Sequence, residues 1–135
     1  MRPADWRDLM LAQTGVSAIV GARVFPVRIP SEVWDSATKK PCLAYSVLDV
    51  ARSQTFCETI PLQNDSVTVN CYARTYDDCQ NLANAIKGVI DFRGLVGQTK
   101  FKAVFLETES DSLDIEPGLY LRILTFAVWN RGVQP

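Results

Sequence analysis

Hydrophobic and polar positions follow a helical period near the N-terminus of the chain. Trp6, Leu9 and Met10 recur at the spacing that puts side chains on one face of a helix, so a helix is predicted from Pro3 to about Gln13. Gly15 is expected to end this helix, and residues 16–20 to add a short turn before Gly21. This helix should bury one apolar stripe against a core.

A second helical pattern, the clearest in the chain, starts after Thr75. A threonine followed three residues later by Asp78 is typical of a helix N-cap. The stripe expected to be buried consists of Cys79, Leu82, Ala83, Ile86, Val89 and Ile90.

Strand-like runs with alternating polarity occupy much of the remaining sequence. Pro26 places the first run at a sheet edge, because proline cannot donate a hydrogen bond to a neighbouring strand. Turns are expected at 51–53 and 63–65, loops at 30–41 and 94–97, and an acidic connection between the last two strands. The predicted strands are Arg23–Ile29, Cys42–Val50, Gln54–Ile60, Ser66–Ala73, Thr99–Glu107 and Leu119–Trp129.

The last predicted strand is apolar on both faces. Leu119, Leu121 and Ile123 point one way, whereas Leu124 and Phe126 point the other. A single helical layer covers only one face of a sheet, so the second face is expected to meet another sheet or another subunit.

These patterns predict an α+β fold. Two main helices pack on one face of an antiparallel sheet or sheets, in the order α-β-β-β-β-α-β-β. The length of 135 residues fits one domain, 1–135, because globular domains cluster near ~100 to 150 residues. The first ten residues carry charges where a signal peptide is apolar, so synthesis in a cytosol is expected.

Composition argues against several classes of function. The chain contains no histidine, which removes Ser-His and Cys-His triads and the commonest metal ligand. Its net charge of −1 lacks the basic footprint of a general nucleic-acid clamp. Four cysteines without a CxxC pair are expected to be reduced, structural thiols. No catalytic residue, metal site or cofactor is predicted.

One acidic run stands out between the last two predicted strands. Three interpretations remain open: a solvated loop, a divalent-cation site, or an acidic surface that repels a polyanion or docks a basic partner. Its members are Glu107, Glu109, Asp111, Asp114 and Glu116.

An ordered set of segments resembles the tail terminator and tail completion proteins of long-tailed phages and gene transfer agents. The similarity covers essentially the whole chain, although no single motif is specific. The segments are VSAIVGARVFP at 16–26, PCLAYSV at 41–47, VTVNCYARTYDDCQNLANAI at 67–86, FRG at 92–94, FLETESD at 105–111 and GLYLRILTFAVW at 118–129.

The resemblance implies a ring-forming structural subunit, expected as a hexamer, without catalysis. Such a ring caps the completed tail tube and joins it to the head connector or stopper protein, and DNA passes through its lumen. Assembly would take place in the host cytoplasm, with the finished protein at the head–tail interface of the virion and no membrane partner.

The resemblance also gives roles to particular residues. Possible interface residues are Arg28, Trp34, Leu119, Leu121 and Ile123, because arginines and large aromatics anchor many interfaces. For Trp34 the alternative is a side chain folded back on its own domain. The acidic run could line the lumen, where like charge keeps DNA from sticking.

A different class of function also fits the sequence. Helix-covered antiparallel sheets host many small ligand-binding or regulatory domains, some of them dimeric, and fold alone does not settle function. A closed ring with a channel would favour the terminator, and a compact dimer with an apolar pocket would favour this alternative.

Overall fold

The computed structural model describes residues 3–21, 23–27, 41–52, 63–97, 99–114 and 119–132 of the chain. Its helices are α1 (Pro3–Ala12), α2 (Thr14–Val20), α4 (Tyr76–Ile86) and the short 3₁₀ helix η1 (Lys87–Val89). Its strands are β1 (Val24–Pro26), β2 (Cys42–Arg52), β3 (Gln63–Ala73), β4 (Gly94–Val96), β5 (Thr99–Asp114) and β6 (Leu119–Gly132).

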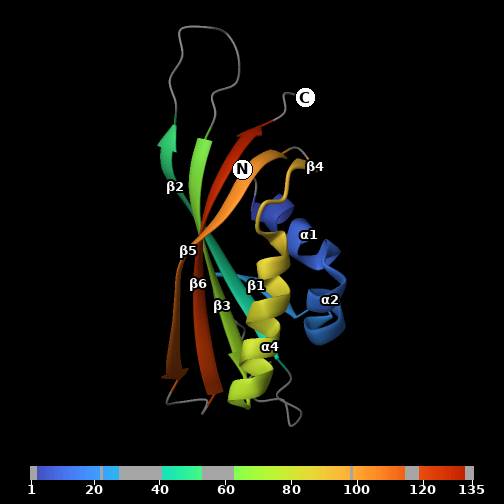
Figure 1. Cartoon of the computed structure of the whole chain (residues 1–135), viewed down its shortest axis with the longest axis vertical. Helices are drawn as coiled ribbons and strands as arrows, with labels where there is room; N and C mark the ends of the chain where they lie inside the picture. The colour runs from blue at the N-terminus through green and yellow to red at the C-terminus, as the bar shows by residue number, and fades with distance from the viewer. Residues whose placement is uncertain are drawn as a thin grey trace, which may run out of the picture.

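Within the described residues, the strands form one curled sheet of six strands in the order β1-β2-β3-β6-β5-β4 (Figure 1). The four long strands β2, β3, β6 and β5 pair with one another antiparallel, and the β5–β6 hairpin is the longest pairing. β1 runs parallel to β2 at one edge, and β4 pairs antiparallel with the start of β5 at the other. The sheet is therefore mixed.

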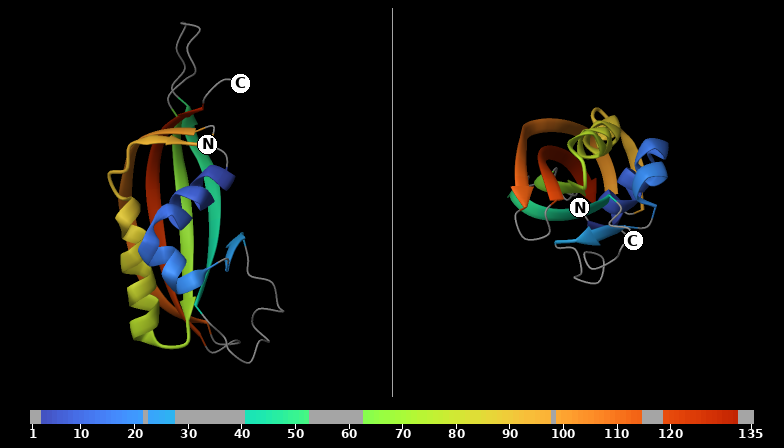
Figure 2. Two further views of the ribbon diagram at one scale, coloured as in Figure 1. Left: turned by 90° about the vertical axis from the view of Figure 1, so that its right-hand side faces the viewer. Right: turned by 90° about the horizontal axis from the view of Figure 1, so that it is seen from below.

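All of the described helices lie on one face of this sheet (Figures 1 and 2). Trp6 of α1 is fully buried, and its ring lies 5.4 Å from Phe126 of β6 and 6.5 Å from Phe101 of β5, measured between ring centroids. Leu82 and Ile86 of α4 are also fully buried against the sheet. This layer confirms the apolar stripes predicted for the two main helices.

A buried polar contact fixes the position of α1. The carboxylate of Asp5 accepts a hydrogen bond of 2.6 Å from the hydroxyl of Thr99 at the start of β5. Both residues are almost completely buried, and an unpaired polar group there would be costly. The contact joins residues 94 positions apart in the chain.

The fold is α+β, as predicted, but the predicted sheet was wrong in direction at one edge. A parallel pair such as β1–β2 needs a connection of a dozen or more residues, and residues 27–41 provide that length. Side-chain alternation does not encode strand direction. The strand predicted at 54–60 lies outside the described residues, and β2 pairs directly with β3.

The predicted number of helices was also wrong: within the described residues there are three α-helices rather than two. The turn expected at 16–20 belongs to α2, a full helix with Gly15 inside it. A Cβ atom at Gly15 would lie 3.3 Å from the Cβ of Ala85, so this glycine allows α2 and α4 to approach closely. The prediction that Gly15 ends the first helix is therefore wrong, because this glycine serves packing inside α2.

Two strand boundaries differ from the prediction. The loop expected at 94–97 contains β4, which forms a tight hairpin with β5, and Gly97 adopts the positive φ of 58° at the turn. The acidic stretch expected to connect the last strands continues β5 to Asp114. The turns expected at 51–53 and 63–65 overlap the ends of β2 and β3. The observed order is α-α-β-β-β-α-β-β-β, with η1 after α4.

The N-cap predicted for the second main helix is confirmed. The hydroxyl oxygen of Thr75 accepts a hydrogen bond of 3.1 Å from the backbone N–H of Asp78, which satisfies one of the free donors at the start of α4. We expect Thr75→Ala to lower the free energy of unfolding by about 1 kcal/mol, and Thr75→Ser to leave it nearly unchanged. Urea denaturation measures both; equal stability of the alanine variant and the wild type would contradict the cap.

Candidate functional site

The face of the sheet opposite the helices carries an apolar band. No described helix lies on this face, which we call the outer face (Figures 1 and 2). Along β6 the side chains that point away from the core alternate with the fully buried Leu124, Phe126 and Val128. The band consists of Leu121, Ile123, Ala127 and Trp129 of β6, with Ala103 and Phe105 of β5 beside them.

The apolar band is partly exposed. Phe105 is 49% exposed, whereas Leu121, Ile123 and Trp129 are half-buried. Exposed apolar area of this kind is typical of surfaces that meet another protein. The expectation that both faces of the last strand are apolar is confirmed, and Leu121 and Ile123 lie on the outer face.

The other predicted interface residues are only partly placed. Leu119 begins β6, but its side chain lies outside the described part of the structure. Arg28 and Trp34 also lie outside it, so their interface role stays a prediction.

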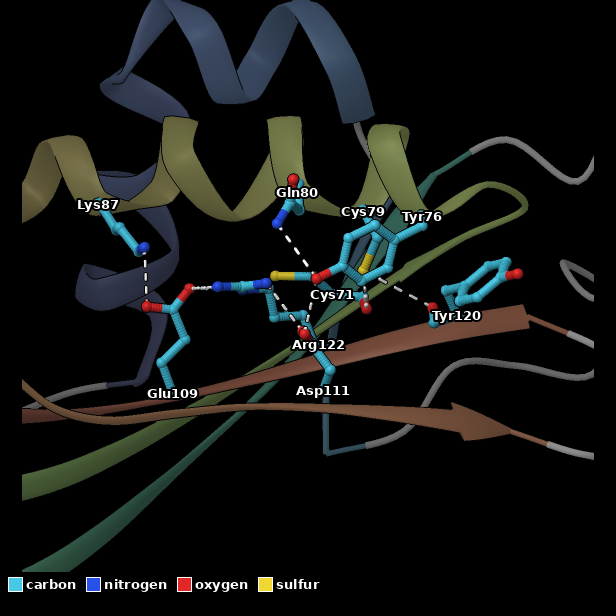
Figure 3. Close-up of polar contacts among 9 residues, drawn as sticks. All are labelled: Cys71, Tyr76, Cys79, Gln80, Lys87, Glu109, Asp111, Tyr120 and Arg122. Carbon is cyan, nitrogen blue, oxygen red and sulfur yellow. Dashed lines mark hydrogen bonds and ion pairs between the residues drawn. The ribbon is translucent and has the colours of Figure 1, made fainter.

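Two of the acidic residues belong to an ion-pair cluster between α4 and the β5–β6 hairpin (Figure 3). The guanidinium of Arg122 pairs with Glu109 and, at 2.9 Å, with Asp111. Lys87 pairs with the second oxygen of Glu109 at 2.8 Å. Tyr76 donates a hydrogen bond of 2.9 Å to Asp111. These contacts tie the helix layer to β5 and β6.

The cluster favours the charged forms of Glu109 and Arg122. Burial alone would raise the pKa of Glu109, but hydrogen bonds and ion pairs with Lys87 and Arg122 outweigh it, so this pKa lies below its usual value. Burial alone would lower the pKa of Arg122, but the contacts with Glu109 and Asp111 outweigh it, so this pKa lies above its usual value. The two carboxylates and two cations balance, so the cluster is close to neutral.

The remaining acidic residues have different surroundings. Glu107 is exposed on β5. Asp114 ends that strand, although its side chain lies outside the described residues, and Glu116 lies outside them altogether. The lumen or docking role of this run stays a prediction, with Glu109 and Asp111 already paired inside the subunit.

Sequence reasoning missed Arg122 as the partner of these acids. The guanidinium comes from β6, where Arg122 lies directly opposite Asp111. One signal was available: a single arginine interrupts the apolar residues of GLYLRILTF. Which acidic residue lies opposite Arg122 depends on the register of the β5–β6 hairpin. Two β-bulges shift this register, and the sequence does not show where they are.

The described cysteines are buried, free thiols. Burial raises the pKa of Cys42 to about 12 and that of Cys79 to about 11, and it raises the pKa of Cys71 as well. The thiol of Cys79 donates to the carbonyl oxygen of Cys71 at 3.3 Å. Cys71 and Cys79 lie on inner faces, as predicted, and act as small apolar groups.

Their burial predicts low reactivity. In a Cys57→Ser variant, which leaves only these three thiols, we expect reaction with a disulfide reagent at pH 8 to be at least about a hundredfold slower in the native state than in denaturant, because the attacking species is an accessible thiolate. Absorbance of the released thiol measures the rates. Rapid native reaction would contradict the described burial.

Comparison with known proteins gives a likeness of fold. No family model matches the chain, and no curated protein matches it by sequence. Among solved structures, one chain of the virion of a native gene transfer agent (GTA) particle superposes with a TM-score of 0.73. The match covers 96% of this chain and 93% of that chain at 13% sequence identity. The fold is therefore that of a known virion chain.

Among the described residues, no helix has both the length and the apolar character needed to cross a membrane.

Proposed function

We propose that the chain is a structural protein of a phage or gene transfer agent virion. The observation that carries this proposal is the likeness of fold to a chain of a GTA virion over nearly the full length of both. The partly exposed apolar band on the outer face supports it, because a subunit that assembles with other proteins needs such a surface.

The proposal has a more specific form: the chain is a tail terminator. It forms an oligomeric ring, caps the completed tail tube, joins it to the head connector and lets DNA pass through the lumen. The ordered segments that resemble the terminator family support this form. A terminator acts by binding, since its two unlike faces match the last tube ring and the head side and so stop tube growth.

Capping of tail tubes tests the specific form. Tubes assembled from the tail tube protein of the same particle are incubated with the purified chain and imaged by negative stain. We expect an added ring at one end of each tube and no further elongation when tube protein is supplied. Tubes that stay uncapped and keep growing would contradict the terminator role.

A negative result in that assay still separates two cases. If the chain is recovered in purified particles by mass spectrometry but at another location, the broader proposal of a virion protein stands. If it forms a dimer that ignores tubes and particles, the small ligand-binding or regulatory domain becomes the better account.

A further inference from the structure

The outer face carries a cluster of positive charge at one end of the molecule. Lys100 of β5 lies opposite Arg131 of β6, and Lys102, at the bulge two residues further along β5, interacts with both. The pKa of Lys102 is lowered, first by the charge of Lys100 and then by burial and by the charge of Arg131. This is consistent with three cations that lie close together. Among the described residues, no carboxylate pairs with any of the three.

This basic end borders the apolar band. Trp129 lies two residues before Arg131 on the same face of β6, and Ala103 lies opposite Trp129 on β5. The Nε atom of Arg131 is buried without a hydrogen-bond partner. A donor that is left unpaired away from water costs free energy until a partner supplies an acceptor. The surface therefore favours an occupant that offers carboxylates together with apolar area.

The opposite end of the same molecule has the complementary character. α4 begins and β5 ends there (Figure 1). Asp77 and Asp78, in the first turn of α4, are exposed and have no ion-pair partner among the described residues. Their two negative charges exceed the single positive charge of the nearby, exposed Arg74. Tyr76 and Tyr120, 41% and 39% exposed, pack edge to face beside them and add aromatic surface.

The edges of the sheet are poorly suited to contact with another protein. Open edges invite pairing with another strand, and proteins block this with prolines, lysines and bulges. Edge strand β1 contains Pro26. β4 pairs only with Thr99–Phe101, so the rest of β5 forms the other edge, and this part carries Lys102 and is bent by two β-bulges in its pairing with β6. Association through the face agrees better with these features than extension of the sheet.

We propose that a second copy of this chain docks its acidic end, marked by Asp77 and Asp78, on the basic end of the outer face, marked by Lys100, Lys102 and Arg131. The contact joins unlike surfaces, so repeated copies close into a ring if the rotation between them allows it. This inference rests on the proposed function, because it names the contact through which a terminator ring would close.

Charge reversal tests the contact. Sedimentation velocity and light scattering are recorded at about 0.15 M salt for wild type, Asp77→Lys/Asp78→Lys and Lys100→Glu/Lys102→Glu. We expect each double variant to need at least about tenfold higher concentration to associate, because like charges then meet. An equimolar mixture of the two, and the variant that combines all four changes, should regain association, since the reversed charges again attract.

Controls separate the contact from general effects. Asp8→Lys adds positive charge at an exposed site on α1 and should associate like the wild type. Thermal melting checks that each variant is folded. If lysine at the start of α4 destabilises the helix, the neutral pair Asp77→Asn/Asp78→Asn is used, and it should weaken association to a smaller extent.

Several outcomes would overturn the inference. They are association of either double variant at the wild-type concentration, failure of the mixture to regain it, and a wild type that stays monomeric at every concentration tested. The proposed function fails separately, when the wild type leaves tail tubes uncapped. Wild-type rings that both reversals leave intact would overturn this contact alone.

Discussion

Replacing Trp6 by alanine should produce the largest loss of stability in the chain. The indole is fully buried and contacts Phe101 and Phe126, so its removal leaves a cavity between α1 and the sheet. A buried tryptophan truncated to alanine costs about 3 to 5 kcal/mol. Urea denaturation followed by circular dichroism should show a midpoint shifted to correspondingly lower urea.

The matched control for this change is Trp129→Ala. Trp129 is half-buried on the outer face, with no described helix above it. Its truncation should cost the monomer less than half as much as truncation of Trp6, because part of the indole is already in water. Equal losses at the two positions would contradict the assignment of core and outer faces.

Replacing Arg122 by methionine should give the second-largest effect. The change leaves Asp111 with only the Tyr76 hydroxyl and leaves Glu109 with only Lys87. The carboxylates of Glu109 and Asp111 then lose their main counter-charge, and we expect the free energy of unfolding to fall by roughly 2 kcal/mol. The cluster is partly open to solvent, which keeps the loss below that of a fully buried pair.

A double-mutant cycle isolates the pair. Arg122→Met, Glu109→Gln and the combined variant are compared by urea denaturation, and the combined loss should be smaller than the sum of the single losses. Strict additivity would mean that the Arg122–Glu109 contact contributes no stability.

The same pair predicts a dependence on pH. The pKa of Glu109 lies below its ordinary value of 4.5 in the folded protein, so its ion pairs stabilise the fold above that pH, and the contribution is lost as the pH falls through the folded value. The stability difference between wild type and Glu109→Gln should therefore shrink below pH 4.5. A difference that stays constant down to pH 3 would contradict this account.

Local patterns predicted the elements that rest on local physics. The Thr75 cap, the buried stripe of α4 and the two-sided character of β6 each follow from neighbouring residues on one helix or strand. The α+β class follows from the same patterns, because a sheet face and a helix stripe must bury each other.

What the sequence did not show depends on contacts between distant segments. The parallel β1–β2 pair, the close approach at Gly15 and the partner of Glu109 are decided by tertiary packing. The acidic stretch illustrates this: it lacks the apolar alternation of a strand, but β5 continues through it, and Arg122 of β6 pairs there with Glu109 and Asp111. The exposed Glu107 remains available for the predicted lumen role.

The central claim is that this chain assembles as a ring of a virion. Light scattering of the purified protein, paired with negative-stain images of the same sample, tests it most directly. The account predicts the mass of a closed ring of about six subunits with a central channel. A stable dimer without a channel would contradict it.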